Sequence, residues 1–318
     1  MTEPTTEATT YDEFSMLGDN AAEAGLVLDA TPVVRRESIA LASGKRLSAL
    51  VWGTAEPELV LLHGGAQNAH TWDTLALALD RPMVAIDLPG HGHSDWRDEH
   101  DYWPPSMADD VAVAIEQLAP NAKAVVGMSL GGLTAICLAA QHPTLVRRLG
   151  IVDVTPGTDH KKAEGIVAFI TGPEYFDDFA AILGRTIEHN PTRTESSLRR
   201  GVLHNARELD DGRWSWRYDP ARGWKSGAAD PAQSDDPAQS VDTVSEYFSP
   251  LWAHVDDVEV PITLYLGGLS PVVGAEDVEE LLRRRPSTIV HRVDGAGHSI
   301  QGDRPLALAA LFEELLAS

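Results

Sequence analysis

Cysteine is almost absent from this sequence of 318 residues, which contains a single thiol, Cys137. One cysteine cannot form an intramolecular disulfide or assemble a thiolate metal cluster, so the fold is stabilised by neither of these. Cys137 lies between Ile136 and Leu138, with no activating base nearby in the sequence. We therefore expect a buried structural thiol and not a catalytic one.

Basic residues are also scarce, because 25 Lys and Arg stand against 48 Asp and Glu and give a formal net charge of -23. Such a protein repels phosphate backbones and anionic lipid headgroups, so we expect no nucleic-acid partner and no membrane partner. No run of about eighteen apolar residues occurs. The N-terminus, MTEPTTEATTYDEF, lacks the basic and apolar regions of a signal peptide. These absences favour a cytoplasmic location.

From Arg36 onward, short β-branched runs alternate with longer amphipathic stretches, which is the order of a mostly parallel sheet covered by helices in an α/β protein. We expect strands near 38–42, 47–52, 58–62, 83–87, 122–127, 148–154, 262–267 and 288–293. Helices are expected over 71–79, 107–118 and 130–142 and near 277–282. The length of the chain favours one large domain with an insertion.

Two segments depart from this alternation. Residues 1–34 contain seven acids and no Lys or Arg, so we expect an acidic N-terminal extension that is partly mobile and can dock a short helix over 21–28. After Thr155 the alternation stops until Pro261, and residues 156–250 carry helical fragments too long for a loop and too irregular for a sheet. We expect a helical cap here, inserted into a core made of 35–155 and 251–318.

One serine has the surroundings of an activated nucleophile. Gly127-Met128-Ser129-Leu130-Gly131 follows an apolar strand and opens a helix, which is the context that a nucleophile elbow requires. The flanking glycines allow a strained turn, and the helix N-terminus favours developing negative charge. The alternative is a tight glycine turn in which Ser129 only caps the helix.

Three more segments surround the elbow in the sequence: Leu62-His63-Gly64-Gly65, Asp87-Leu88-Pro89-Gly90-His91-Gly92-His93-Ser94 and Gly295-Ala296-Gly297-His298. By the order and spacing of these motifs, the chain resembles the α/β-hydrolase fold family from about Arg36 to the C-terminus. The resemblance implies a mostly parallel eight-stranded sheet flanked by helices, with the cap inserted after strand 6. It also implies a serine hydrolase whose general base is His298, because a serine needs a base to take its proton.

The other histidines are weaker candidates for the general base or for a metal ligand. His63 belongs to the loop that resembles the oxyanion loop of the family, and the loop containing Asp87, His91 and His93 is one that the family uses structurally. No His-Glu-x-x-His occurs, and no histidine pair has the spacing of a zinc-binding helix. We therefore expect neither a metal nor a cofactor.

The acid that orients His298 is less clear from the sequence. The usual family acid follows the strand 263–266, but the matching turn has Pro271 where an aspartate would be expected. Asp277 lies further along, within a predicted helix. Asp153 ends an apolar strand, where a lone acid needs a partner. Some branches of the family, including certain haloalkane dehalogenases and zearalenone lactonases, carry their acid after that strand. We therefore favour Asp153, with Asp277 as the alternative.

The oxyanion of an acyl transfer reaction needs backbone N–H donors that are in place before the reaction begins. The elbow geometry assigns one to Leu130, and Gly65 resembles the position of the second, with Ala66 as the alternative.

These residues predict a hydrolase that acts on carboxylic ester bonds through an acyl-enzyme. The substrate is expected to be a small hydrophobic ester or lactone bound under residues 156–250. A macrolactone of zearalenone type is the sharper expectation, because a serine elbow combined with an early acid resembles the lactonases of that type. A general carboxylesterase and a carbon–carbon bond hydrolase are the alternatives. A ligand receptor with the same fold is the competing class, and a homodimer through the cap or the N-terminus is compatible with the sequence.

Overall fold

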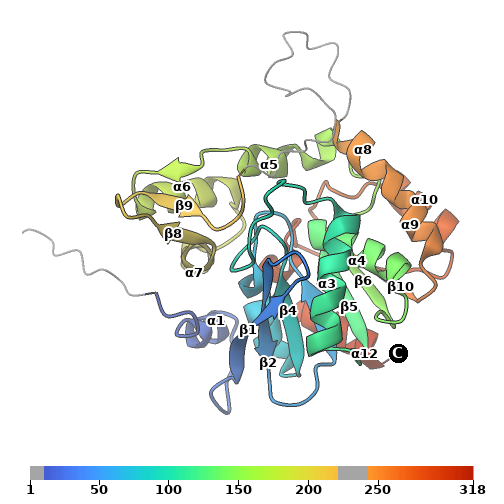
Figure 1. Cartoon of the computed structure of the whole chain (residues 1–318), viewed down its shortest axis with the longest axis horizontal. Coiled ribbons are helices and arrows are strands. Elements are labelled where there is room, and N and C mark those ends of the chain that lie inside the picture. The colour runs from blue at the N-terminus through green and yellow to red at the C-terminus, as the bar shows by residue number, and fades with distance from the viewer. Residues whose placement is uncertain (1–10, 221–242, 318) are drawn as a thin grey trace, which may run out of the picture.

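The structure, a computed structural model, describes residues 11–220 and 243–317 (Figure 1). Its centre is an eight-stranded sheet with the strand order β1-β2-β4-β3-β5-β6-β10-β11. The pairs β1·β2 and β2·β4 are antiparallel, and the other neighbouring pairs are parallel. The strands are β1 (Val34–Ala40), β2 (Arg46–Trp52), β3 (Leu59–Leu62), β4 (Met83–Asp87), β5 (Ala124–Met128), β6 (Leu149–Val152), β10 (Ile262–Gly267) and β11 (Ile289–Val293). The mostly parallel sheet predicted from the sequence is confirmed.

Helices cover both faces of this sheet. One face carries α3 (Pro104–Leu118), α4 (Leu130–Gln141), α9 (Trp252–Asp257) and α10 (Ala275–Arg284). The other carries α1 (Leu17–Glu23), α2 (Asp73–Leu79), α11 (Ile300–Asp303) and α12 (Pro305–Ala317). In β3, Val60 and Leu62 belong to the first apolar layer, and Leu59 and Leu61 to the second. Because both faces are buried, central strands such as β3 and β5 are continuous apolar runs, whereas the edge strands β1 and β11 are not. Within the described residues, no helix is long and apolar enough to cross a membrane.

The segment between β6 and β10 contains its own small sheet. Its helices are α5 (His160–Ile170), α6 (Phe179–His189), α7 (Glu195–Asn205) and α8 (Thr243–Phe248). Its strands are β7 (Tyr175–Phe176), β8 (Ala206–Glu208) and β9 (Trp214–Trp216), which pair antiparallel in the order β7-β9-β8. The expectation that this segment is too irregular for a sheet is corrected here. Strands of two or three residues are too short to show a periodic pattern.

This segment also has an apolar cluster of its own, which contains Phe176, Ile182, Leu198 and Trp216. Ala66, from the loop that follows β3 in the main sheet, belongs to the same cluster. The segment therefore rests on the carboxyl edge of the sheet. Residues 221–242 of the expected cap lie outside the described residues.

The N-terminal extension docks its helix earlier than the sequence indicates. The helix is α1 and not a helix over 21–28. Leu17 and Ala21, one turn apart, are buried in the core, and the helix does not continue past Gly25, whose φ of 72° is left-handed. α1 also contacts α7, since Glu23 forms an ion pair with Arg200, and the Oδ1 of Asn20 accepts a hydrogen bond from the Nε of Arg200 at 2.6 Å. The extension thus holds α7 against the core. Residues 1–10 lie outside the described residues.

Candidate active site

Ser129 lies at a sharp turn between the end of β5 and the first residue of α4. Its backbone angles, φ 51° and ψ −121°, fall outside the regions that side-chain-bearing residues ordinarily adopt, which costs about 1–3 kcal/mol. Two glycines permit the turn, because a Cβ on Gly131 would lie 2.5 Å from the carbonyl oxygen of His63, and a Cβ on Gly127 would lie 2.1 Å from that of Gly131. The turn leaves Ser129 partly exposed at the N-terminus of a helix.

The two expected oxyanion donors lie next to each other and next to the elbow. A Cβ built on Gly65 would be 3.9 Å from the Cβ of Leu130. Neither the N–H of Gly65 nor that of Leu130 has a hydrogen-bond partner among residues 11–220 and 243–317. Both residues are partly exposed, whereas Ala66, the alternative donor, is only 4% exposed. The geometry therefore offers two free donors beside Ser129, which is what an oxyanion requires.

Asp153 directly follows β6, and its side chain is buried, at 1% exposure. Its Oδ2 accepts a hydrogen bond from the Nδ1 of His298 at 2.8 Å, and its Oδ1 accepts one from the backbone N–H of Gly267 at 2.9 Å. A buried carboxylate is stable only when such donors compensate its charge. The structure therefore brings Asp153 and His298 together, and leaves the Nε2 of His298 for proton transfer.

Asp277, the alternative acid, has different partners. Its Oδ2 accepts hydrogen bonds from the Nζ of Lys162 and from the backbone N–H of Gly274, both at 2.8 Å. The second of these bonds caps the start of α10. Asp277 is thus a capping and ion-pairing residue, and it does not contact His298.

Ser270 is a residue of the site that the sequence did not reveal. Its Oγ donates a hydrogen bond to Oδ2 of Asp153, the same oxygen that binds His298. The sequence pattern places the usual acid of this turn at Pro271, and in the structure the neighbouring Ser270 is the residue directed at Asp153. The N–H of Ser270 bonds to the carbonyl oxygen of Gly267 at 3.1 Å, which closes the turn and directs position 270 toward β6. Ser270 therefore donates a hydrogen bond to Asp153, the acid that follows the neighbouring strand β6.

No hydrogen bond joins the hydroxyl of Ser129 to the ring of His298 in the part of the chain that the structure describes. The loop after β3 connects the two residues, because it lies beside Ser129 and is hydrogen-bonded to Ser299, the neighbour of His298. A Cβ on Gly64 would lie 3.3 Å from the Cβ of Ser129. The side chain of Gln67 accepts a hydrogen bond from the N–H of Gly64 and donates one to Oγ of Ser299, both at 3.2 Å. In free enzymes, catalytic hydrogen bonds are often long and tighten only when substrate binds.

Asp87 and His63 support these loops. The Oδ1 of Asp87 accepts a hydrogen bond from the N–H of Ala69 at 2.7 Å, and its Oδ2 lies 2.7 Å from Nη1 of Arg36. Burial alone would raise the pKa of Asp87, but the guanidinium of Arg36 holds it below its usual value. The Nε2 of His63 accepts a hydrogen bond from the N–H of Leu88 at 2.9 Å. These contacts fit the structural role expected for this region.

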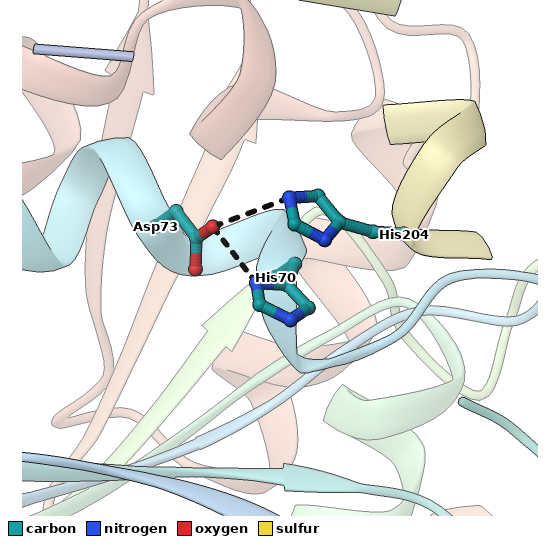
Figure 2. Close-up of side chains that lie close together, drawn as sticks. All are labelled: His70, Asp73 and His204. Atoms are coloured by element: carbon teal, nitrogen blue, oxygen red, sulfur yellow. Dashed lines mark hydrogen bonds and ion pairs between the residues drawn. The ribbon is translucent and has the colours of Figure 1, made fainter. Parts of the chain in front are cut away.

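A cluster of potential metal ligands lies outside this site. His70, Asp73 and His204 each place one ligand atom within 4.8 Å of the others (Figure 2). However, the two imidazole rings are stacked, with centroids 3.7 Å apart and an interplanar angle of 11°. The lone pair of an imidazole nitrogen lies in the plane of its ring, so two parallel rings cannot direct both nitrogens at one ion. The arrangement does not fit a metal.

The same cluster fits a charged histidine paired with acids. The Nδ1 of His70 is 2.9 Å from Oδ2 of Asp73, and its Nε2 is 2.9 Å from Oε1 of Glu13. Burial alone would lower the pKa of His70, but these carboxylates raise it to about 9. His204 shows the opposite, because burial and the charge of His70 lower its pKa well below the usual value. A charged ring is thus stacked on a neutral one where α7 meets η1 (Ala69–Trp72).

Comparison with known proteins agrees with the fold and the motifs. A model of the alpha/beta hydrolase fold family matches residues 57–305. The chain belongs to the α/β-hydrolase fold family. It is 44% identical over 317 residues to the esterase Rv0045c of Mycobacterium tuberculosis, with 98% of this chain and 97% of that protein covered. A solved structure of that esterase has a TM-score of 0.82 and 43% identity, and covers 98% of this chain and 100% of its own.

A more distant relative is an sn-1-specific diacylglycerol lipase from Mus musculus. It is 27% identical over 268 residues, which cover 78% of this chain and 77% of that protein. The similarity to the mycobacterial esterase covers nearly the whole of this chain, whereas the similarity to the lipase covers about four fifths of it.

Ser270 and His298 bind the same oxygen of Asp153, so we predict that an acid at position 270 can replace the acid at position 153. We expect Asp153→Asn to lower kcat by about 10⁴-fold, because an amide stabilises the wrong tautomer of His298. Adding Ser270→Asp to this variant should recover at least about tenfold of the lost activity, because position 270 faces the same point in space and an acid there again pairs with the histidine. Steady-state kinetics of the purified variants with an aryl ester measure both effects.

Leu269→Asp in the Asp153→Asn background is the matched control. Leu269 is adjacent in the chain but 66% exposed, so its acid should recover nothing. Equal recovery at 269 and 270, or none at 270 in a folded protein, would contradict the placement of Ser270.

The charge on His70 predicts a pH-dependent stability. Its pKa in the folded protein, about 9, lies above the usual 6.5, so protonated His70 stabilises the fold fully below about pH 6.5, and this contribution is lost as the pH rises through 9. We expect His70→Gln to lower Tm more at about pH 6 than at about pH 9.5. Thermal denaturation measures the difference. His142→Gln, at a partly exposed histidine, is the control. An equal loss for His70→Gln at both pH values would show that His70 is not charged.

Proposed function

We propose that this protein is a serine hydrolase that cleaves a carboxylic ester or lactone through a covalent acyl-enzyme on Ser129. One observation carries the proposal: a serine in a strained turn lies beside two free backbone donors, on the sheet edge where a buried aspartate binds a histidine. The family of the chain and its 44% identity to an esterase support ester bonds as the target. The protein is a hydrolase that acts on ester bonds.

In the first half of the reaction, Oγ of Ser129 attacks the carbonyl carbon of the ester while the Nε2 of His298 accepts the hydroxyl proton. The imidazolium that forms is stabilised by Asp153 through the bond to Nδ1. The negative charge that develops on the carbonyl oxygen is stabilised by the N–H groups of Leu130 and Gly65. The tetrahedral intermediate collapses, and His298 returns the proton to the departing alcohol.

In the second half, water enters the position that the alcohol has left. His298 takes a proton from this water, and the resulting hydroxide attacks the acyl carbon. The bond to Oγ breaks, the proton returns to Ser129, and the carboxylic acid leaves. One ester and one water thus give one acid and one alcohol, and no cofactor takes part in the balance.

We further propose that residues 156–250 act as a cap on a core made of 35–155 and 251–318, and that the cap selects the substrate. Ile170 of α5 supports this, because its Cδ1 would lie 3.7 Å from a Cβ built on Gly65. Phe169 and Trp216 of the same segment contact each other with ring centroids 5.6 Å apart. An apolar cover beside the oxyanion donors favours a bounded, hydrophobic substrate. A macrolactone of zearalenone type is the sharper form of the proposal, based on a serine elbow combined with an acid after β6.

The nucleophile is tested with a fluorophosphonate probe, which reacts with activated serines. We expect the wild type to be labelled and Ser129→Ala to lose both the label and on the order of 10⁴-fold or more in kcat/KM. Ser43→Ala, at an exposed turn residue, should be labelled like the wild type. A folded wild type that neither takes the label nor turns over any ester would overturn the enzyme hypothesis in favour of a ligand receptor.

The sharper substrate proposal is tested by kcat/KM for a resorcylic macrolactone and for a short aryl ester, with Ser129→Ala as the blank. A strong preference for the macrolactone would support a dedicated lactonase pocket under the cap. A preference for the small ester would overturn the lactone proposal and leave a general carboxylesterase.

A further inference from the structure

A polar cavity lies on the far side of the oxyanion loop, between the inserted segment and the core. Among the side chains that line it are Gln67, Asn68, Asn190, Ser197, Asn205 and Ser299. Two arginines, Arg193 and Arg200, line it as well, and no described Asp or Glu does, although the whole protein has a net charge of -23. A cavity that combines cations with neutral hydrogen-bonding groups, in a protein with an excess of acids, has the electrostatic character of an anion site.

The two arginines differ in their partners. Arg200 forms an ion pair with Glu23, so its charge is compensated. Arg193, in the turn between α6 and α7, has no carboxylate within ion-pair distance among the described residues. Its Nη2 donates to Oγ of Ser197 at 2.5 Å, while its buried Nε has no hydrogen-bond partner in the described part of the chain. Burial lowers the pKa of Arg193, and the neighbouring charges of Asp303 and Glu23, which act in the opposite direction, offset this cost only in part.

A carboxylate is the kind of ligand that suits Arg193. A guanidinium binds a carboxylate through two parallel N–H···O bonds. The Nη1 of Arg193 has no hydrogen-bond partner among the described residues, and it would lie 3.0 Å from a Cβ built on Gly302, which lines the cavity. Side-chain amides such as that of Asn190 and the hydroxyl of Ser197 line the same space.

The cavity shares a wall with the candidate active site. Gln67 and Ser299 line it and are hydrogen-bonded to each other at 3.2 Å. Gln67 also binds the N–H of Gly64 in the oxyanion loop, and Ser299 directly follows His298 in the chain. An anion in the cavity would therefore lie behind the two loops that carry the oxyanion donor and the base.

We propose that this cavity binds a small organic carboxylate through Arg193. The carboxylate belongs either to the substrate, at a distance from its scissile bond, or to a separate molecule such as a released acid. The choice between these sources rests on the proposed esterase function, whereas the binding itself does not.

Binding is measured first, with succinate as the probe and full-length Ser129→Ala protein, which removes turnover. Isothermal titration and the succinate-dependent rise in Tm give the affinity. We expect Arg193→Gln to weaken binding by at least about tenfold, because it removes a charge-assisted hydrogen-bond pair. Arg199→Gln is the matched control, since Arg199 lies on α7, is exposed and undergoes the same change of charge. It should bind within about twofold of the parent protein.

Arg193→Lys provides a second variant in case the glutamine variant does not fold. It keeps the charge but loses the planar fork, so an intermediate affinity is expected. Circular dichroism checks the fold of each variant. The proposal is overturned if the folded parent shows neither heat nor a Tm shift with succinate, or if Arg193→Gln binds succinate as well as Arg199→Gln does.

The source of the carboxylate is determined with two aryl esters of glutaric acid, one with its second carboxylate free and one with that group methylated. A carboxylate on the substrate predicts that Arg193→Gln raises KM for the free acid by about tenfold and leaves the methylated ester unchanged. A separate molecule predicts equal changes for both esters, together with the loss of succinate binding. If neither ester is turned over by a protein whose Ser129 takes the fluorophosphonate label, the carboxylate does not belong to a substrate of this kind. If the label is absent as well, the proposed function fails, and the titration still decides the cavity.

Discussion

The negative charge of Asp153 is buried at the end of β6, and the arrangement around it follows from the need to stabilise that charge. Water is replaced by three donors, which come from the N–H of Gly267, the hydroxyl of Ser270 and the ring of His298. Gly267 is the last residue of β10, which is parallel to β6, and Ser270 lies in the turn after it. His298 follows β11, the next parallel strand of the sheet. The orientation of His298 is therefore a consequence of how the carboxylate is solvated, because a ring that rotated away would leave it short of a donor.

The parts of the structure that could be predicted from the sequence are those with a local signal. The buried strands are apolar runs, and the elbow around Ser129 is defined by glycines that no other residue could replace without a clash. Asp153 stood out because a lone acid in an apolar strand needs a partner, and the structure pairs it with His298 across 145 positions of the chain. Such pairs follow from motifs only when the fold is already inferred, because it is the parallel sheet that brings their strand ends to one edge.

Other features had no local signal. Ser270 could be recognised only once the acid was known to lie on the neighbouring strand, since its bond to Asp153 spans 117 positions. The small sheet consists of strands of two or three residues, whose pairing depends on the aromatic cluster around Trp216. The early start of α1 depends on which of its residues reach the core. Arg193 stands out only in three dimensions, because there it lines a cavity without described acids and has no ion-pair partner among the described residues.

The contacts between the N-terminal extension and α7 constrain how the inserted segment can move. An insertion is joined to its core by two covalent connections, but here α7 is attached a third time, through Glu23 and Asn20 to Arg200 and through the hydroxyl of Tyr11, which lies 2.7 Å from Nδ1 of His204. Helix α5, which covers Gly65, has no such attachment to the extension among the described residues. Any opening above Ser129 that preserves these contacts must therefore be a rotation with α7 as its pivot.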